Sequence, residues 1–314
     1  MAVADRVKRA IGGHCAPGGG GKKTRSCLRN SDVQQLRTRL KAAGKDPNPR
    51  RHATRCAKKD DACLLGALED IGLPTQDIAR KRLVPQAPTS WTKKPATWLT
   101  TPEFGQVMRQ YEAAYPEFEF LGATPIDFSR PLGKSCVWPR ICKFTLKQAN
   151  ARGKTKIGFV FNEDNHKEPG SHWICAFLDI TKREFYYIDS VGNPVPDEIK
   201  ALVARLSAES MALTGRKLTF RANTMPHQRG DNQCGMYCLF FIIALLTGTA
   251  TYKELVRRRI PDSAMAEMRK VVFRPRGPRA PGPGTTTRRK TRRAKRRTKR
   301  TRRRTKRNSK RRGG

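Results

Sequence analysis

The stretch Met225–Leu246, MPHQRGDNQCGMYCLFFIIALL, determines the fold that this sequence predicts. Its first part, up to Gln233, is polar and prone to turns. From Cys234 onward it is apolar almost without interruption, and it shows no period-2 alternation. A segment that is apolar on every side belongs in the core of a sizeable domain, and this one is shorter than the roughly 20 residues that span a bilayer. The stretch therefore predicts a loop that leads into a buried helix.

Cys234 is expected in the first turn of that helix. The unpaired backbone N–H groups and the positive end of the helix dipole favour an anion there, so a thiol at this position is suited to ionise and attack. The alternative is a buried structural cysteine, which is the interpretation we favour for Cys238 one turn later. Partner residues elsewhere in the chain have to decide between the two.

Two upstream runs, Ser171–Leu178 and Glu184–Ile188, are rich in β-forming residues and are separated by a short polar segment. This pattern predicts a β-hairpin. If Leu178 faces Arg183 across a four-residue loop, the same register places His172 opposite Asp189.

A histidine that faces an aspartate supplies a base and the carboxylate that orients it. With Cys234 as nucleophile, His172 and Asp189 would complete a catalytic triad. Taken alone, His172 fits an ordinary residue at a strand end equally well, and Asp189 fits a turn former.

Three short motifs and one glutamine carry a family resemblance. They are Gly170-Ser171-His172-Trp173, Tyr187-Ile188-Asp189-Ser190, Cys234-Gly235-Met236-Tyr237, and Gln228 six residues before Cys234. This pattern resembles the ubiquitin-like-protein-specific cysteine proteases, a group that includes the SUMO proteases and the adenovirus endopeptidase. The order His, Asp, Cys separates this group from papain-like enzymes, in which the cysteine comes first.

The resemblance implies a role for each residue. His172 would be the general base and acid, Asp189 its orienting carboxylate and Cys234 the nucleophile. Gln228, with the backbone N–H of Cys234, would stabilise the oxyanion, and Trp173 would cover a narrow substrate tunnel. The sequence departs from the group at Gln233, where many cellular members have Asp, so SUMO specificity does not follow from the resemblance.

The charge of the chain is unusual. A net charge of +40 over 314 residues indicates an anionic partner, for which nucleic acid is the best candidate. Residues 288–312 contribute 18 Lys or Arg and no acid, so about +22 remains for the rest. The odd count of nine cysteines and the lack of an apolar segment after Met1 favour a reducing compartment and argue against secretion.

The sequence divides into five parts. Residues 1–28 are glycine-rich and are expected to be flexible, and residues 29–73 are expected to form a small helical domain that contains cysteines. Residues 74–97 contain four prolines and predict a linker. Residues 98–273 would be the protease domain, and residues 274–314 a disordered basic tail.

The sequence leaves open whether the N-terminal region binds metal and what the helical domain and the tail bind. The histidines and cysteines near the N-terminus lack the close pairs of most zinc sites, so packed cysteines are favoured over metal. They are His14, Cys15, Cys27, His52, Cys56 and Cys63. The helical domain suits either protein docking or nucleic-acid binding, and the tail either nucleic-acid binding or nuclear localisation.

For the protease domain the sequence predicts an α+β fold around a mixed sheet of about five strands. The expected strands are residues 118–121, 156–161, 172–178, 184–188 and 217–221. A first helix is expected to contain Trp98-Leu99, because the segment resembles the WL-containing first helix of the same protease group. Further helices are expected over residues 196–206 and, beyond the central helix, over residues 252–259 and 262–272.

These features predict a thiol endopeptidase that cleaves small-residue sites, expected to be Gly-Gly-X, in polypeptide precursors. Within the resembled group the sequence looks most similar to proteases of large DNA viruses that process structural precursors. That similarity implies location in the virion and in the cytoplasm or nucleus of an infected cell. We expect no membrane partner and no cofactor, with nucleic acid as a possible non-chemical activator. Two alternatives are a deconjugating or maturing protease for a ubiquitin-like protein and a catalytically idle DNA-packaging protein.

Overall fold

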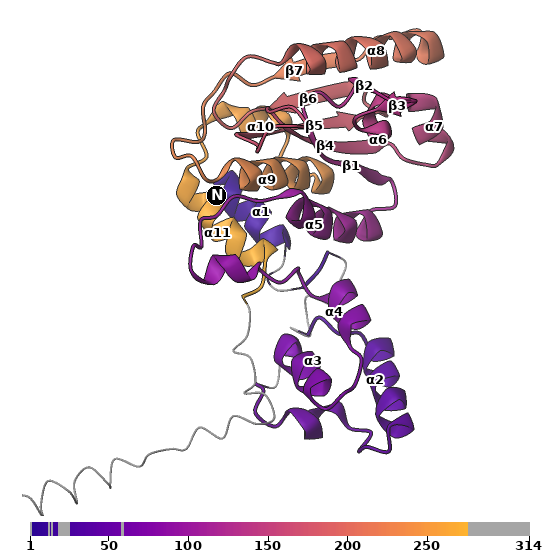
Figure 1. Cartoon of the computed structure of the whole chain (residues 1–314), viewed down its shortest axis with the longest axis vertical. Helices are drawn as coiled ribbons and strands as arrows, with labels where there is room; N and C mark the ends of the chain where they lie inside the picture. The colour runs from indigo at the N-terminus through magenta and orange to yellow at the C-terminus, as the bar shows by residue number, and fades with distance from the viewer. Residues whose placement is uncertain (1, 12, 14, 18–25, 58–59, 276–314) are drawn as a thin grey trace, which may run out of the picture. The chain divides into compact units, whose positions relative to one another are not determined.

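The computed structural model describes residues 2–11, 13, 15–17, 26–57 and 60–275 (Figure 1). The tail predicted from residue 274 therefore lies almost wholly outside the described residues, as do Gly12, His14 and the glycines at 18–21.

A mixed five-stranded sheet forms the centre of the domain predicted to be a protease, called the protease domain below, in the order β1-β4-β5-β6-β7. Its strands are β1 (Phe118–Pro125), β4 (Lys156–Asn162), β5 (Trp173–Asp179), β6 (Glu184–Ile188) and β7 (Thr219–Ala222). The two outer pairs, β1 with β4 and β6 with β7, are parallel, and the two inner pairs are antiparallel. This topology confirms the predicted α+β fold. A separate short hairpin joins β2 (Pro131–Leu132) to β3 (Ser135–Cys136).

The apolar run after the polar loop forms the buried helix α9 (Cys234–Thr247). Every residue from Cys234 to Ala244 is buried, because the helix packs between one face of the sheet and further helices (Figure 1). The helices of this layer are α5 (Thr101–Ala114), α10 (Tyr252–Arg257) and α11 (Asp262–Val272). The prediction of a loop that leads into a core helix is confirmed.

The opposite face of the sheet is covered by a second apolar cluster. Its helices are α6 (Pro139–Cys142), α7 (Leu146–Ala151) and α8 (Asp197–Thr214). The predicted stripe on α8 is buried there, at Ile199, Leu202, Val203 and Leu206. The sheet is therefore apolar on both faces, as the continuous apolar runs of β4 and β5 require.

The predicted hairpin exists, but its predicted register was wrong. Leu178 pairs with Phe185, two residues further along than Arg183. The turn begins after the pair Asp179–Glu184, and Arg183 adopts a left-handed conformation with φ of 56° inside it. The loop of the hairpin therefore comprises residues 180–183, whereas the predicted four-residue loop comprised residues 179–182.

A small helical domain, called the arm below, contains α2 (Asn30–Ala42), the 3-10 helix η1 (Pro49–Ala53), α3 (Asp61–Asp70) and α4 (Gln76–Arg82). The helical domain predicted over residues 29–73 is present, with α2 and α3 in that range, but the prediction that residues 74–97 form a linker was wrong. Ile78 and Leu83 are buried in the core of the arm, and a second 3-10 helix, η2 (Thr89–Thr92), buries Trp91 in the protease core. The prolines here separate short helices and do not prevent them.

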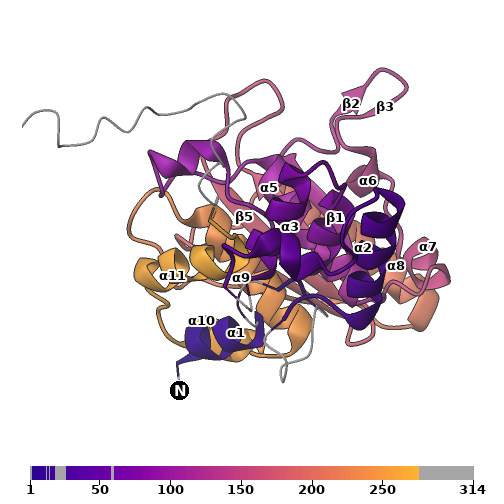
Figure 2. The ribbon, with the colours of Figure 1, turned by 90° about the horizontal axis from the view of Figure 1, so that it is seen from below.

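The prediction of a flexible N-terminus over residues 1–28 was also wrong for its first turns. Helix α1 (Val3–Ile11) buries Val7 and Ile11 in the protease core, next to α9 and α11. Figure 2 shows α1 beside α10 and α11. Arg6 pairs with Glu254 at 2.6 Å, and Lys8 pairs with Glu267 at 3.2 Å. Apolar residues four apart at 3, 7 and 11 form a stripe, and the neighbouring glycines obscured it in the sequence.

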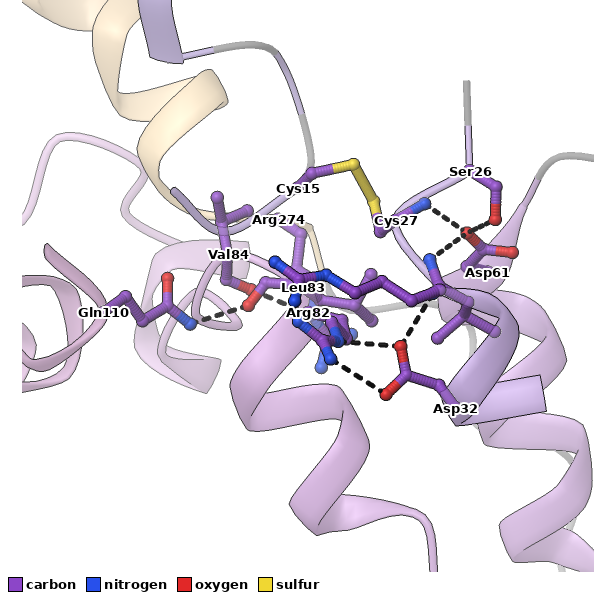
Figure 3. Close-up of a disulfide and its surroundings, with 12 residues drawn as sticks. Cys15, Ser26, Cys27, Asp32, Asp61, Arg82, Leu83, Val84, Gln110 and Arg274 are labelled. Carbon is purple, nitrogen blue, oxygen red and sulfur yellow. Dashed lines mark hydrogen bonds and ion pairs between the residues drawn. A yellow bond between two sulfur atoms is a disulfide. The ribbon is translucent and has the colours of Figure 1, made fainter. Parts of the chain in front are cut away.

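Hydrogen bonds connect the arm to the protease domain at the end of α4 (Figure 3). The amide of Gln110 in α5 donates to the Leu83 carbonyl at 2.8 Å. Arg274 donates its Nε to the Val84 carbonyl at 3.2 Å and its backbone N to Pro85 at 2.9 Å. The described fold therefore includes Arg274, and the tail begins later than the sequence suggested.

Six of the nine cysteines form disulfides, which corrects the expectation of packed free thiols. The pairs are Cys15–Cys27 (Figure 3), Cys56–Cys63 and Cys136–Cys142. The partners lie 12, 7 and 6 residues apart in sequence, and their Cα atoms are 5.2, 5.6 and 6.7 Å apart, which a disulfide spans. The free cysteines are Cys175, Cys234 and Cys238, all buried.

Within the described residues, no three His, Cys, Asp or Glu side chains gather as a metal site. Over the same residues, no helix is both long and apolar enough to cross a membrane.

Candidate active site

Asp189 follows β6 directly and is completely buried. Its Oδ1 accepts a hydrogen bond from the backbone N of Val191 at 3.1 Å, and its Oδ2 accepts one from the backbone N of Asn193 at 2.7 Å. These backbone donors fix the carboxylate, which then has one strong partner among the side chains, His172.

His172 lies just before β5, and its Nε2 is 2.6 Å from Oδ1 of Asp189. The two side chains meet in spite of the register error, because both stand just beyond the paired part of the hairpin. Since Nε2 faces the carboxylate, Nδ1 is the nitrogen left to face the thiol of Cys234, which lies near enough to raise the pKa of His172. Burial lowers the pKa of His172, but the hydrogen bonds to Asp189 and Cys234 outweigh it and raise the pKa to about 10. The imidazole is therefore protonated at neutral pH.

Cys234 is the first residue of α9, with Gln233 as the N-cap, as predicted. The residue is only 1% exposed. The helix N-terminus and the imidazolium of His172 both favour a negative charge on the sulfur. The structure thus brings together the three predicted triad residues from the end of β6, the start of β5 and the start of α9.

Gln228 lies in the loop before α9, and both ends of its side-chain amide have partners. Its Oε1 accepts from the hydroxyl of Ser190 at 3.0 Å, and its Nε2 donates to the Gly230 carbonyl at 2.5 Å. Because an amide nitrogen carries two N–H donors, one is left for an oxyanion. Ser190 was not singled out from the sequence, although it follows Asp189 directly.

Trp173 is held by three contacts. Its Nε1 donates to the Leu99 carbonyl at 2.9 Å, its ring packs edge-on against Phe104 at 5.1 Å, and its own carbonyl accepts from the thiol of Cys238. The predicted Trp98-Leu99 pair precedes α5 and does not belong to it, and its carbonyl orients Trp173 next to the catalytic histidine.

Comparison with known proteins agrees with this geometry. Residues 147–275 match the model of the Ulp1 protease family, C-terminal catalytic domain. Over these residues the chain is similar to Ulp1-type cysteine proteases. The matched range contains every predicted triad and oxyanion residue.

Viral proteins are among the relatives of this chain. A thiol protease of Acanthamoeba polyphaga mimivirus is 29% identical over 223 residues, which is 68% of this chain and 69% of that protein. A cysteine protease of African swine fever virus is 30% identical over 120 residues, which is 38% of this chain but only 44% of the relative. The crystal structure of an African swine fever virus protease superimposes with a TM-score of 0.64 and 20% identity, covering 84% of this chain and 96% of that one. It shows that the two proteins share a fold.

Asn223 is a positioning residue of this site that the sequence did not reveal. Its Oδ1 accepts from the backbone N of Asp189 at 2.8 Å, and its Nδ2 donates to the Asp189 carbonyl at 2.7 Å. A second donation reaches the Met225 carbonyl at 3.0 Å. One side chain therefore clamps the backbone of the catalytic aspartate and links it to the loop that leads to Cys234. No local sequence signal marks it, because its partner is 34 residues away.

Arg269 of α11 is a second residue that the sequence did not reveal. It is 8% exposed, and no described carboxylate lies within ion-pair distance. Its Nη1 donates to the Thr97 carbonyl at 2.8 Å, and its guanidinium lies 4.3 Å from the centre of the Trp91 ring. Burial lowers the pKa of Arg269 to about 10, and the charge of Cys234 opposes that shift. The buried cation is therefore within electrostatic reach of the nucleophile.

Proposed function

We propose that this chain is a thiol endopeptidase that cleaves polypeptides at small-residue, Gly-Gly-X sites. The observation that carries the proposal is the contact of 2.6 Å between His172 and the fully buried Asp189, with Cys234 at the start of a buried helix. A carboxylate that orients an imidazole, which in turn contacts a thiol, is the arrangement that activates a sulfur nucleophile.

In the proposed reaction, Sγ of Cys234 attacks the scissile carbonyl carbon. The carbonyl oxygen becomes an oxyanion that accepts hydrogen bonds from Gln228 Nε2 and the backbone N–H of Cys234. The imidazolium of His172 then protonates the leaving amine as the C–N bond breaks. Neutral His172 next takes a proton from water, whose oxygen attacks the thioester carbonyl carbon. The C–S bond breaks, the acyl product leaves as a carboxylic acid, and the thiolate of Cys234 and the imidazolium of His172 are restored.

The crowding around Cys234 supports a preference for glycine. The nucleophile is 1% exposed, so a substrate has to approach as a thin strand. A Cβ atom added to Gly235 would lie 2.9 Å from Cβ of Leu99, whose carbonyl holds Trp173. Leu99 thus packs closely against Gly235, the residue next to the nucleophile, and we expect residues without side chains to fit this crowded approach best.

We further propose that the substrates are structural precursors processed during virion assembly, in the virion or in the infected cell. The viral origin of the relatives supports this context. The alternative substrate is a folded ubiquitin-like protein, in keeping with the name of another African swine fever virus relative, SUMO-1 cysteine protease.

We also propose nucleic acid as a partner of the basic segment beyond the described fold, with its 18 Lys or Arg over residues 288–312. A chain that ends at Pro275 keeps the contacts of Arg274 and every proposed catalytic residue. It is expected to retain peptidase activity and to lose most of its affinity for duplex DNA. If its DNA affinity falls with salt as steeply as that of the full chain, the folded part carries the binding.

A thiol-reactive probe that ends in Gly-Gly tests the proposed activity. It is expected to label Cys234 in the full chain, and labelling should fall sharply in His172→Ala. Asp189→Asn should lose less than Asp189→Ala. Precursor peptides with Gly-Gly-X are then compared with folded ubiquitin-like substrates to separate the two substrate classes. If the probe does not label the folded wild-type chain, the protein is catalytically idle and the proposal is wrong.

A further inference from the structure

A polar hollow of about 360 Å³ lies on the arm, against the exposed side of α2. It is lined by Gln34, Arg37, Thr38, Lys41, Pro47 and Asn48. Arg37 and Lys41 are one helical turn apart and both are exposed, so their charged ends reach the same hollow.

The carboxylates of the arm are all engaged elsewhere. Five of them form ion pairs with other arginines, and the other two accept hydrogen bonds from Cys63 N and from Thr75. The ion pairs are Arg39–Asp77, Arg50–Asp61, Arg51–Asp46, Arg55–Asp70 and Arg82–Asp32. Among the ion pairs of the described residues, none includes Arg37 or Lys41. The arm thus pairs its carboxylates with other arginines and leaves two cations uncompensated at the hollow.

The remaining groups of the hollow suit an anion with several acceptor oxygens. The Thr38 hydroxyl donates to the Gln34 carbonyl at 3.1 Å, and Oδ1 of Asn48 accepts from the backbone N of Arg50 at 3.1 Å. The side-chain N–H groups of Gln34 and Asn48 therefore add donors beside the two cations. A guanidinium and an ammonium together with amide donors are groups that bind phosphate oxygens.

We propose that this hollow binds the phosphodiester backbone of duplex nucleic acid, independently of the basic segment at residues 288–312. Phosphate suits this hollow because five of its six lining residues carry polar or charged side chains, and only Pro47 does not. No aromatic residue lines it for base stacking, and binding is therefore independent of base sequence.

The test uses the full chain and duplex DNA of unrelated sequences over a salt series. The variant Arg37→Gln/Lys41→Gln is compared with Lys143→Gln/Lys147→Gln, which removes two cations from the protease domain. Loss of two phosphate contacts makes the slope of log affinity against log salt concentration shallower by about 1.8. Between 50 and 200 mM salt the wild type should therefore lose about 12 times more of its DNA affinity than the arm variant loses. The control variant should keep the wild-type slope.

Acetylation footprinting of lysines in the same full-length complex adds a reading at the site itself. Bound DNA should protect Lys41 and leave Lys143 and Lys147 reactive. The proposal is overturned if Lys41 stays reactive in the complex, or if both double variants lower the slope equally, because binding would then be spread over the whole basic surface. Equal protection of Lys41 by polyglutamate at the same ionic strength would also overturn it, since the site would then not select phosphate.

Discussion

The clamp that Asn223 places on the catalytic aspartate can be tested by Asn223→Ala. The change leaves the buried N–H of Asp189 without its partner, Oδ1 of Asn223 at 2.8 Å. The Asp189 carbonyl loses the hydrogen bond of 2.7 Å from Nδ2 of Asn223 but keeps the one from the backbone N of Gly192 at 3.2 Å. Each stranded buried group costs about 1 to 3 kcal/mol. The Met225 carbonyl is half-buried and can recover a partner from water. With one buried group stranded, we therefore expect the free energy of unfolding to fall by about 1 to 3 kcal/mol.

The same substitution should also lower kcat. The carboxylate of Asp189 keeps its two backbone donors, Val191 and Asn193, so the triad persists but is less well oriented. A misplacement of about 1 Å costs up to about 10²-fold in rate. Urea unfolding measures the stability, and peptide turnover at low temperature, where the variant stays folded, measures kcat.

Asn193→Ala is the matched control. It removes an exposed asparagine side chain from the same loop but keeps the backbone N–H that donates to Asp189, so stability and turnover should stay close to wild type. Asn223→Asp should be more harmful than Asn223→Ala at neutral pH, because it loses a donor and sets a second carboxylate beside Asp189. If Asn223→Ala unfolds at the wild-type urea concentration, the clamp does not stabilise the site and the reasoning fails.

Three further predictions concern the surroundings of the nucleophile. Gln228→Ala should lower kcat by about 10² to 10³-fold with little change in KM, as for other oxyanion donors; an effect on KM alone would make Gln228 a substrate contact. His227 is fully buried, and burial, assisted by the charge of Arg259, lowers its pKa to about 4. Because the unfolded chain binds a proton near pH 6.5, the wild type should lose up to about 3 kcal/mol of stability as the pH falls from 6.5 to 4, and urea unfolding of His227→Leu should lack this loss. Arg269→Leu should destabilise the fold by about 2 to 4 kcal/mol through loss of the Thr97 hydrogen bond and the Trp91 contact; unfolding of the variant at the wild-type urea concentration would show that neither contact stabilises the fold.

Local pattern was enough to predict the central features of the protease domain. The continuous apolar run after Cys234 has only one low-energy placement, a buried helix, and runs of β-branched and aromatic residues predicted the five strands. The triad residues could be identified because each lies at the end of such an element. A motif of a few neighbouring residues there indicates both the strand or helix and the catalytic side chain.

The sequence was misleading where a residue's environment comes from distant parts of the chain. Glycines next to α1 and prolines around α4 suggested flexible segments, but Val7 and Ile78 are ordered because cores formed by other elements bury them. The hairpin register depended on a left-handed residue, Arg183, that nothing in its neighbourhood requires. The cysteine pairs likewise depended on which loops fold back on themselves.

The sequence by itself thus determined the fold class, the buried helix and the identity of the residues proposed for catalysis. Only the tertiary structure decided how those residues are held. Asn223 reaches Asp189 across 34 positions, and Arg269 reaches the Thr97 carbonyl across 172. A hydrogen bond of this kind leaves no periodicity in the chain, because its two ends belong to different elements that meet only after the core has formed.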